Sequence, residues 1–507
     1  MKLLFVKSMA LAAAAVLLLI LGGSVLPPGI PAMPESGTNT SAESTTTVTG
    51  GETTTGGGTG QHPSENGQTS LPSSGGSTTE SPSEQTESTS AGTVSTGSAA
   101  GSTVRPGSSS ASSGKPGTSP STKPGNTTTA KPPAASAGSS TTKPTTGTPS
   151  PTPSVPKKTV VGYYTGWSAY QGYTPSKVPA QYLTHLNYAF AKIDPKTKQI
   201  ALADPTQDRT NFAALRKLKK SNPHLKTLIS VGGWDYSTYF SDVAASASSR
   251  EAFAQSCVDF ILEHGFDGVD LDWEYPVSGG AAGNSNRPQD KANFTLLLRA
   301  IRAKLDAQGK KDGRTYYLTI AGAANTSYLS KIEPQAVAGI VDYIFVMTYD
   351  MHGPWDQYAD FNAPLYTPSE SSPQYKNSVY DGIQAYLGKG VPASKLVLGM
   401  PFYGYLYQGV DSTNGGLYSR FSSAKAVTYD TVRGAYLSNS AYTKHRHATA
   451  QVPYLSGNGL FLSYEDPTSI AAKAALAKSL NLAGAGAWSL AQDTSGALLK
   501  SAYQALM

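Results

Sequence analysis

The sequence predicts an α/β fold, a (β/α)8 TIM barrel with a small α+β insertion, preceded by a disordered linker. In the C-terminal part of the chain, short runs of β-branched and aromatic residues alternate with helix-like segments, which is typical of a parallel sheet. These runs number eight, as many as close such a barrel. The region 158–507 also has the length of a barrel that carries an insertion.

The predicted strands are short and bounded by turn-forming or polar residues. In chain order they are 160–165, 185–193, 226–231, 268–273, 316–321, 341–348, 395–402 and 484–490. Apolar residues at helical spacing between most of them predict helices at 211–220, 250–264, 292–308, 378–387 and 468–479. The only cysteine, Cys257, lies within the second of these helices, so we predict a core position for it and no intrachain disulfide.

A segment rich in tyrosine, from about 405 to 464, interrupts the alternation of predicted strands and helices. We predict a small α+β insertion there. Because it follows the seventh strand, it would stand beside the carboxyl ends of the barrel strands. Its tyrosines could stack on a ligand, but packing within the insertion explains most of them.

The N-terminal third has the composition of an exported leader and a tether. Lys2 and Lys7 precede an apolar run from Met9 to about Leu26, so we predict that residues 1–33 are a signal peptide or a signal anchor. Residues 34–157 are almost wholly Ser, Thr, Gly and Pro, which predicts a disordered linker. We therefore expect a secreted or cell-surface protein. Cleavage and retention as a membrane anchor both remain open, and the linker could reach across a cell wall.

Charge gives little support for a nucleic acid partner. The formal net charge is +6, but lysine and arginine are spread over the linker and the folded region without a cluster. We expect a monomer that binds no nucleic acid.

The most informative segment is 266–276, where carboxylates occupy every second position of an apolar, β-forming run. Side chains alternate between the two faces of a strand, so Asp270, Asp272 and Glu274 would share one face. Placing several carboxylates together on a buried strand costs free energy, because like charges repel and some of the groups must take up a proton. General acid/base chemistry is therefore the favoured interpretation.

Two other interpretations explain this acidic row less well. A solvated edge strand would not explain why the intervening Val269, Leu271 and Trp273 form an apolar face. A divalent metal site would use carboxylates, but the surrounding residues do not resemble a calcium loop, and His264 and His352 are not at ligand spacing. We predict neither a metal nor a cofactor.

Other chemistry-bearing residues fall at the predicted carboxyl ends of strands, where barrels of this kind form their active sites. They are Tyr163, the Ser230-to-Trp234 segment with Gly232 and Gly233, Tyr349 with Asp350, Tyr403, and Trp488. Each alone has a simpler explanation as a turn or a core residue. Together they predict one site.

With these residues in place, the chain resembles the chitinases of glycoside hydrolase family 18 over 160–507. Asp267, Asp270, Asp272 and Glu274 match the family's D-x-x-D-x-D-x-E motif, and Ser230, Gly232 and Gly233 match its S-x-G-G motif. Met347, Tyr349 and Asp350 match its M-x-Y-D motif, and Trp488 matches its strand-eight tryptophan. The insertion after strand seven resembles that of the subfamily with deep clefts. One departure is Tyr405, which stands where we would expect an arginine in many relatives.

The resemblance implies hydrolysis of β-1,4 links between N-acetylglucosamine units, with retention, by substrate-assisted catalysis. Glu274 would protonate the leaving oxygen, and the substrate's own acetamido carbonyl would attack the anomeric carbon to form an oxazolinium ion. Asp272 would orient the acetamido N–H, and Asp270 would share a proton with Asp272.

The same resemblance implies the other site residues. Tyr349 would aim the acetamido carbonyl, and Asp350 would contact the distorted sugar above a floor formed by Trp488. Trp234 and Trp355 would stack sugars on the leaving-group side, and Tyr163 with Ser230 would support Asp270. The implied substrate-binding set is completed by Met347, Tyr403 and Tyr275.

Three functions remain open at this point. Chitin or chitooligosaccharide is the favoured substrate, in part because all five tryptophans lie in the barrel. The same chemistry could instead act on peptidoglycan or on the chitobiose core of N-linked glycans. A non-catalytic lectin is disfavoured because Glu274, the acid that such relatives lose, is present.

Overall fold

The computed structural model describes residues 158–371 and 377–507. The predicted leader (1–33) and linker (34–157) lie outside the described residues.

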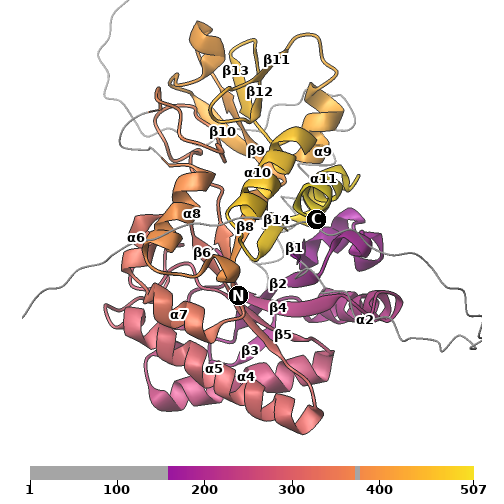
Figure 1. Ribbon diagram of the computed structural model, residues 1–507, viewed down its shortest axis with the longest axis vertical. Helices are drawn as coiled ribbons and strands as arrows, with labels where there is room; N and C mark the ends of the chain where they lie inside the picture. Colours follow the sequence, from indigo (N-terminus) through magenta and orange to yellow (C-terminus); the bar gives the residue numbers. More distant parts are fainter. Residues whose placement is uncertain (1–157, 372–376) are drawn as a thin grey trace, which may run out of the picture. The chain divides into compact units, whose positions relative to one another are not determined.

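The described chain forms a closed barrel of parallel strands, which confirms the predicted fold class (Figure 1). In spatial order the barrel strands are β1 (Thr159–Thr165), β14 (Gly484–Trp488), β8 (Leu396–Pro401), β7 (Tyr343–Met347), β6 (Tyr317–Ala323), β5 (Gly268–Asp272), β4 (Lys226–Gly232) and β2 (His185–Ile193). Parallel pairing of β1 with β2 closes the ring. A short strand, β3 (Ile200–Leu202), adds antiparallel to β2.

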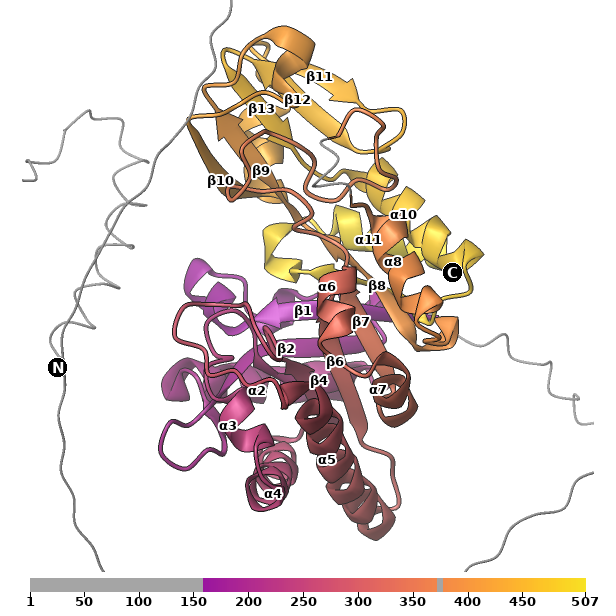
Figure 2. The same cartoon turned by 90° about the vertical axis from the view of Figure 1, so that its left-hand side faces the viewer.

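Helices lie on the outside of the barrel, as Figures 1 and 2 show for α2, α4, α5 and α7. The main helices are α2 (Pro205–Ser221), α4 (Ala247–His264), α5 (Asp290–Asp312), α7 (Pro334–Ile340), α8 (Val379–Gly388), α10 (Pro467–Ser479) and α11 (Ala497–Leu506), with short α3 (Phe240–Ala244) and α6 (Thr326–Ser330). Cys257 is buried in α4, as predicted. None of the helices within the described ranges is both long and apolar enough to cross a bilayer.

The two faces of β5 have different surroundings. Trp273, at the end of the strand, packs outward between the ring of Phe240 from α3 and that of Phe294 from α5, each with its centroid 5.4 Å away. Val269 and Leu271 are fully buried in the same core. Packing against the helices thus fixes Val269, Leu271 and Trp273 on the outer face of the barrel. Because side chains alternate along a strand, the carboxylates between them lie on the inner face.

The insertion after β8 is a five-stranded antiparallel sheet in the order β10-β9-β13-β12-β11. Its strands are β9 (Tyr403–Gln408), β10 (Ser423–Thr428), β11 (Thr443–Arg446), β12 (Pro453–Gly457) and β13 (Leu460–Ser463), and a single helical turn, α9 (Tyr429–Thr431), follows β10. The sheet thus begins at Tyr403, two residues before the predicted start of the insertion.

Most insertion tyrosines pack within the insertion. Tyr454 contacts Phe461, and Tyr436 contacts Tyr442. A small separate core that includes Leu406, Leu455 and Leu462 supports the sheet. Tyr403 and Tyr405 at the start of β9 are exceptions, because their hydroxyls point to a residue of the barrel, Asp350.

Candidate active site

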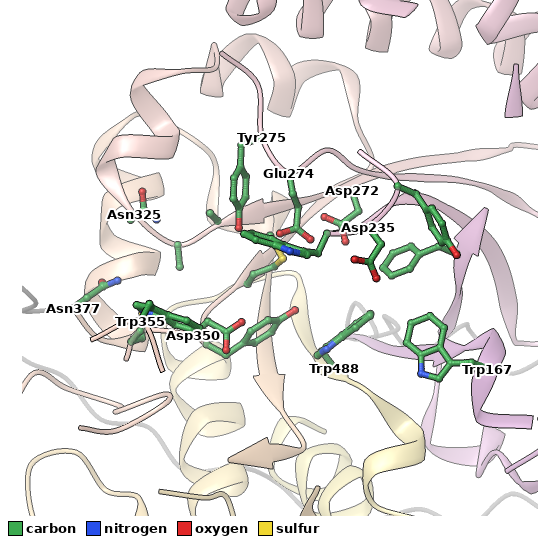
Figure 3. A pocket seen from close by; sticks show the side chains of 18 residues that line it. Trp167, Asp235, Asp272, Glu274, Tyr275, Asn325, Asp350, Trp355, Asn377 and Trp488 are labelled. Atoms are coloured by element: carbon green, nitrogen blue, oxygen red, sulfur yellow. The ribbon is translucent and has the colours of Figure 1, made fainter. Parts of the chain in front are cut away.

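A cavity of about 620 Å³ opens at the carboxyl ends of the barrel strands (Figure 3). Predicted residues that line it are Asp272, Glu274, Tyr275, Met347, Tyr349, Asp350, Trp234, Trp355 and Trp488. Tyr163, Ser230, Asp270 and Tyr403 are not among the lining residues. All four are buried behind the cavity wall. Tyr163 and Ser230 donate hydrogen bonds to Asp270, and Tyr403 donates one to Asp350.

The backbone at the end of β5 is held by residues of two neighbouring loops. Ser237 Oγ donates to the Asp272 carbonyl at 3.1 Å and accepts from the Glu274 N–H at 2.9 Å. Asn284 Nδ2 donates to the Glu274 carbonyl at 2.8 Å. The polypeptide on both sides of Glu274 is therefore fixed before any ligand binds, which is the preorganisation that a catalytic acid requires.

Gly232 makes this arrangement possible at the end of β4. Its φ is 109°, and a Cβ there would lie 2.2 Å from the carbonyl oxygen of Asp272. Any side chain would displace the strand end that carries the acids. Gly232 is thus required by close packing against β5, whereas a Cβ on Gly233 would lie 2.5 Å from the ring of Phe190 on β2.

Asp270 is fully buried and accepts three hydroxyl hydrogen bonds. Tyr163 and Ser230 donate to Oδ2 at 2.9 and 2.8 Å, and Thr319 donates to Oδ1 at 2.6 Å. Burial raises the pKa of Asp270, and these hydrogen bonds offset part of the effect. Thr319, on β6, has no place in the sequence motifs and was missed.

Asp272 lies between Asp270 and Glu274 in the inward-facing row. Burial, and then the charges of Glu274 and Asp270, raise its pKa well above the usual range. Its Oδ1 atom is buried and accepts no hydrogen bond from the described residues. Asp272 lines the cavity, where its carboxyl group can accept a hydrogen bond from a ligand N–H.

Glu274 projects into the centre of the cavity (Figure 3). Burial raises its pKa to about 7, with added repulsion from Asp350 and Asp235, although a hydrogen bond with Tyr275 lowers it in part. A carboxyl group with this pKa carries its proton in a substantial fraction of molecules near neutral pH, as a general acid must.

Tyr349 and Asp350 form another wall of the cavity. Burial, followed by the charges of Asp272 and Asp350, raises the pKa of Tyr349 well above its usual value, so its hydroxyl stays protonated and can donate to a ligand. Asp350 is accessible to solvent in the cavity. Enclosure by the walls raises the pKa of Asp350, and hydrogen bonds from Tyr403 and Tyr405 partly offset this.

Aromatic side chains line the cavity on both sides of Glu274. Trp234 and Trp355 are 53% and 59% exposed. On the other side, Phe190 lies between Trp488 and Trp167, with ring centroids 5.6 and 6.3 Å away. In Figure 3, Trp355 and Trp167 lie on opposite sides of Glu274. This arrangement can stack on the apolar faces of several sugar rings.

Trp167, which is 49% exposed and lines the cavity, was missed by the sequence analysis, as were Phe190 and Asp235. Trp167 follows the end of β1 within a short 3-10 helix, Gly166–Gln171. Its place after a barrel strand was the available signal, but a single tryptophan is more often a core residue.

No group of three or more His, Cys, Asp and Glu side chains in 158–371 and 377–507 is arranged to hold a metal ion. The cavity instead offers a carboxyl group that can give up a proton, a carboxylate that can accept an N–H, and a tyrosine hydroxyl that can donate to a carbonyl. This set suits acid-assisted cleavage of a bond next to an amide-bearing group.

Comparison with known proteins agrees with this chemistry. The family model described as glycosyl hydrolases family 18 matches residues 159–493. Chitinase A1 of Niallia circulans is 42% identical over 66% of this chain and 56% of its own length. Chitotriosidase-1 of Mus musculus is 33% identical over 66% and 73%. The chain thus spans little more than half of the bacterial relative.

Solved structures show the same likeness. Chitinase ChiA74 from Bacillus thuringiensis superposes with a TM-score of 0.66 at 33% identity, covering 69% of both chains. A family 18 N-acetylglucosaminidase from Paenibacillus barengoltzii has a TM-score of 0.63 at 35% identity over 69% of this chain and all of its own. Barrel, acidic row and family match together show that the chain belongs to glycoside hydrolase family 18.

Proposed function

We propose that this protein is a chitinase that hydrolyses β-1,4 links between N-acetylglucosamine units with retention of configuration. The observation that carries the proposal is the placement of Glu274, Asp272 and Tyr349 around one cavity with Trp488. The relatives named chitinase A1, at 42% identity, and chitotriosidase-1, at 33% identity, support the choice of substrate class.

In the first half of the reaction, Glu274 gives its proton to the glycosidic oxygen as the bond to the anomeric carbon breaks. The acetamido oxygen of the same sugar forms a bond to that carbon and yields an oxazolinium ion. Asp272 accepts a hydrogen bond from the acetamido N–H and stabilises the positive charge. Tyr349 donates to the acetamido oxygen and aims it.

In the second half, water adds to the anomeric carbon as Glu274, now a carboxylate, accepts the water proton. The acetamido oxygen departs, and the configuration is retained after two inversions. Asp270, which its three hydroxyl donors keep in place, lies behind Asp272 and can share a proton with it. The pair is best treated as one coupled acid system.

The test is product analysis by mass spectrometry after incubation with N-acetylglucosamine hexamer, with peptidoglycan and with an N-glycan core, each in parallel. Shorter oligomers from the hexamer support the proposal, and their sizes report endo or exo cutting. If the hexamer stays uncleaved while peptidoglycan or the N-glycan core is cleaved, the cleaved glycan is the substrate instead of chitin. Binding without cleavage of any of them would support a lectin.

A second substrate tests the role of the acetamido group. A glucosamine hexamer without N-acetyl groups lacks the internal nucleophile. We expect it to be cleaved much more slowly than the acetylated hexamer. Equal rates on both would contradict substrate-assisted catalysis while leaving a glycosidase in place.

We also propose that the enzyme acts outside the cell, either secreted or held at the surface. The proposal rests on the charged and apolar leader and on the Ser, Thr, Gly and Pro composition of 34–157. Fractionation of producing cells, with N-terminal sequencing of the mature protein, would separate cleavage after the leader from retention in the membrane. An intracellular, unprocessed protein would contradict it.

A further inference from the structure

Among the described residues, the Asp350 carboxylate is held by two tyrosine hydroxyls and by no cation. Tyr403 and Tyr405 both donate to its Oδ1 atom, at 2.5 and 2.7 Å. None of the salt bridges among the described residues involves Asp350. One carboxylate oxygen is thus occupied by neutral donors, and the other, Oδ2, is left for a ligand in the cavity.

The geometry behind this contact comes from strand β9. Tyr403 and Tyr405 are two residues apart, so they project from the same face of the strand, and their ring centroids lie 5.7 Å apart. Both side chains are 6% exposed. Asp350 itself has a φ of 55° and is held through its N–H by Asn362 Oδ1 at 2.9 Å.

Tyr405 also contacts the leaving-group side of the cavity. Its ring meets Trp355 edge to face, with centroids 5.7 Å apart and an interplanar angle of 85°. Trp355 is 59% exposed and lines the cavity. One buried side chain of the insertion sheet therefore supports both Asp350 and an aromatic ring expected to bind sugar.

We propose that Tyr405 is a positioning residue that aims Asp350 at the sugar next to the cleaved bond, holds Trp355 in its stacking position, and keeps the charge of Asp350 free of a cationic partner. The inference deepens the proposed function and rests on it. Its distinctive element is that both side-chain donors to Asp350 are neutral hydroxyls.

Because Tyr405 is a neutral donor to Asp350, it affects the pKa of Glu274. The charge of Asp350 is one of the causes that raise the pKa of Glu274. A guanidinium beside Asp350 would compensate that charge and add a positive one, which favours ionised Glu274. With Tyr405 in place, Glu274 keeps its proton to higher pH than it would beside an arginine.

Three variants separate these roles. Tyr405→Phe keeps the ring against Trp355 but removes the hydroxyl, so we expect kcat/KM on the acetylated hexamer to fall about tenfold. Tyr405→Leu removes both contacts and should in addition raise KM. Tyr405→Arg should move the alkaline limb of the kcat/KM profile to lower pH, by at least about half a unit. Tyr405→Phe should leave that limb nearly in place.

The matched control is Tyr442→Phe, a partly buried tyrosine that packs against Tyr436 within the insertion. It should leave kcat/KM and the pH profile unchanged. Thermal unfolding of each variant identifies any loss of folded protein, and activity is expressed per folded molecule.

The outcomes are distinct. If the wild-type enzyme does not cleave the hexamer, the proposed function fails. If it does, and Tyr405→Phe retains wild-type kcat/KM while Tyr405→Arg leaves the alkaline limb unmoved, the inference about Tyr405 is overturned and the proposed function stands.

Discussion

Asp267 and Glu274 belong to one sequence motif but lie at opposite ends of strand β5. Asp267 immediately precedes the strand and lines a small surface pocket with Lys219, Lys226 and Arg314. Glu274 follows the strand and projects into the large cavity. The motif therefore combines a structural acid at one end of the barrel with the proposed catalytic acid at the other, in agreement with the division of roles in such barrels.

Replacement of Asp267 by asparagine should destabilise the protein without reaching the chemistry. The buried carboxylate accepts from Lys219 Nζ at 2.6 Å, from the Thr227 N–H at 2.8 Å and from Arg314. We expect the free energy of unfolding to fall by about 3 kcal/mol, as measured by chemical denaturation, with kcat per folded molecule retained. Asp306→Asn, in a pair where the aspartate is 56% exposed, is the control and should change little.

Acid should weaken the same contact. Burial alone would raise the pKa of Asp267, but the hydrogen bonds from Lys219, Thr227 and Arg314 outweigh it and the net pKa is lowered. The stabilisation from these bonds is present above the unfolded-state pKa, about 4, and is lost as pH falls below it. The stability difference between wild type and Asp267→Asn should therefore shrink in acid, and a difference that grows there would contradict the assignment.

The alkaline limb of kcat/KM should fall with an apparent pKa near 7. A raised pKa keeps Glu274 protonated below that value, and the acid form disappears as pH rises through it. Initial rates on the acetylated hexamer, measured in buffers of constant ionic strength, give the profile. A decline that is already complete near pH 5 would show that Glu274 has an ordinary carboxyl pKa.

Trp167→Ala should weaken the binding of long substrates. Trp167 is the outermost ring of the aromatic wall that includes Phe190 and Trp488. Loss of its exposed face should raise KM for the hexamer between about three- and tenfold, with a smaller effect on a trimer, because a shorter chain bound at Glu274 extends less far along the cavity. Tyr366→Ala, at an exposed tyrosine that does not line the cavity, is the control. An equal rise in KM for trimer and hexamer would argue against a subsite at Trp167.

The barrel could be predicted from sequence because its strands are marked by continuous apolar runs, and these fall within a few residues of the observed ones. The start of helix α2 was predicted too late. Helix α2 begins at Pro205, capped by Asp204, which accepts from the Thr206 and Gln207 N–H groups, whereas we predicted its start at 211. The first turn is polar and lacks the apolar spacing that marks the later part.

The acidic row could be predicted because strand alternation places its members together. Contacts between residues that lie far apart in the sequence could not be predicted. Tyr405 reaches Asp350 over 55 residues, through an insertion whose sheet order depends on tertiary pairing. Thr319 reaches Asp270 from a strand with no motif. Such partners become visible only when neighbouring elements are placed in space.

The most direct test of the central claim is a comparison of Glu274→Gln with the wild type on the acetylated hexamer. Glutamine keeps the shape of the side chain but cannot donate the proton, so we expect at least about a hundredfold lower kcat, with the fold and hexamer binding retained by thermal unfolding and calorimetry. Glu263→Gln, on the exposed surface of α4, is the matched control and should match the wild type. Near-wild-type turnover by folded Glu274→Gln would contradict its role as the catalytic acid.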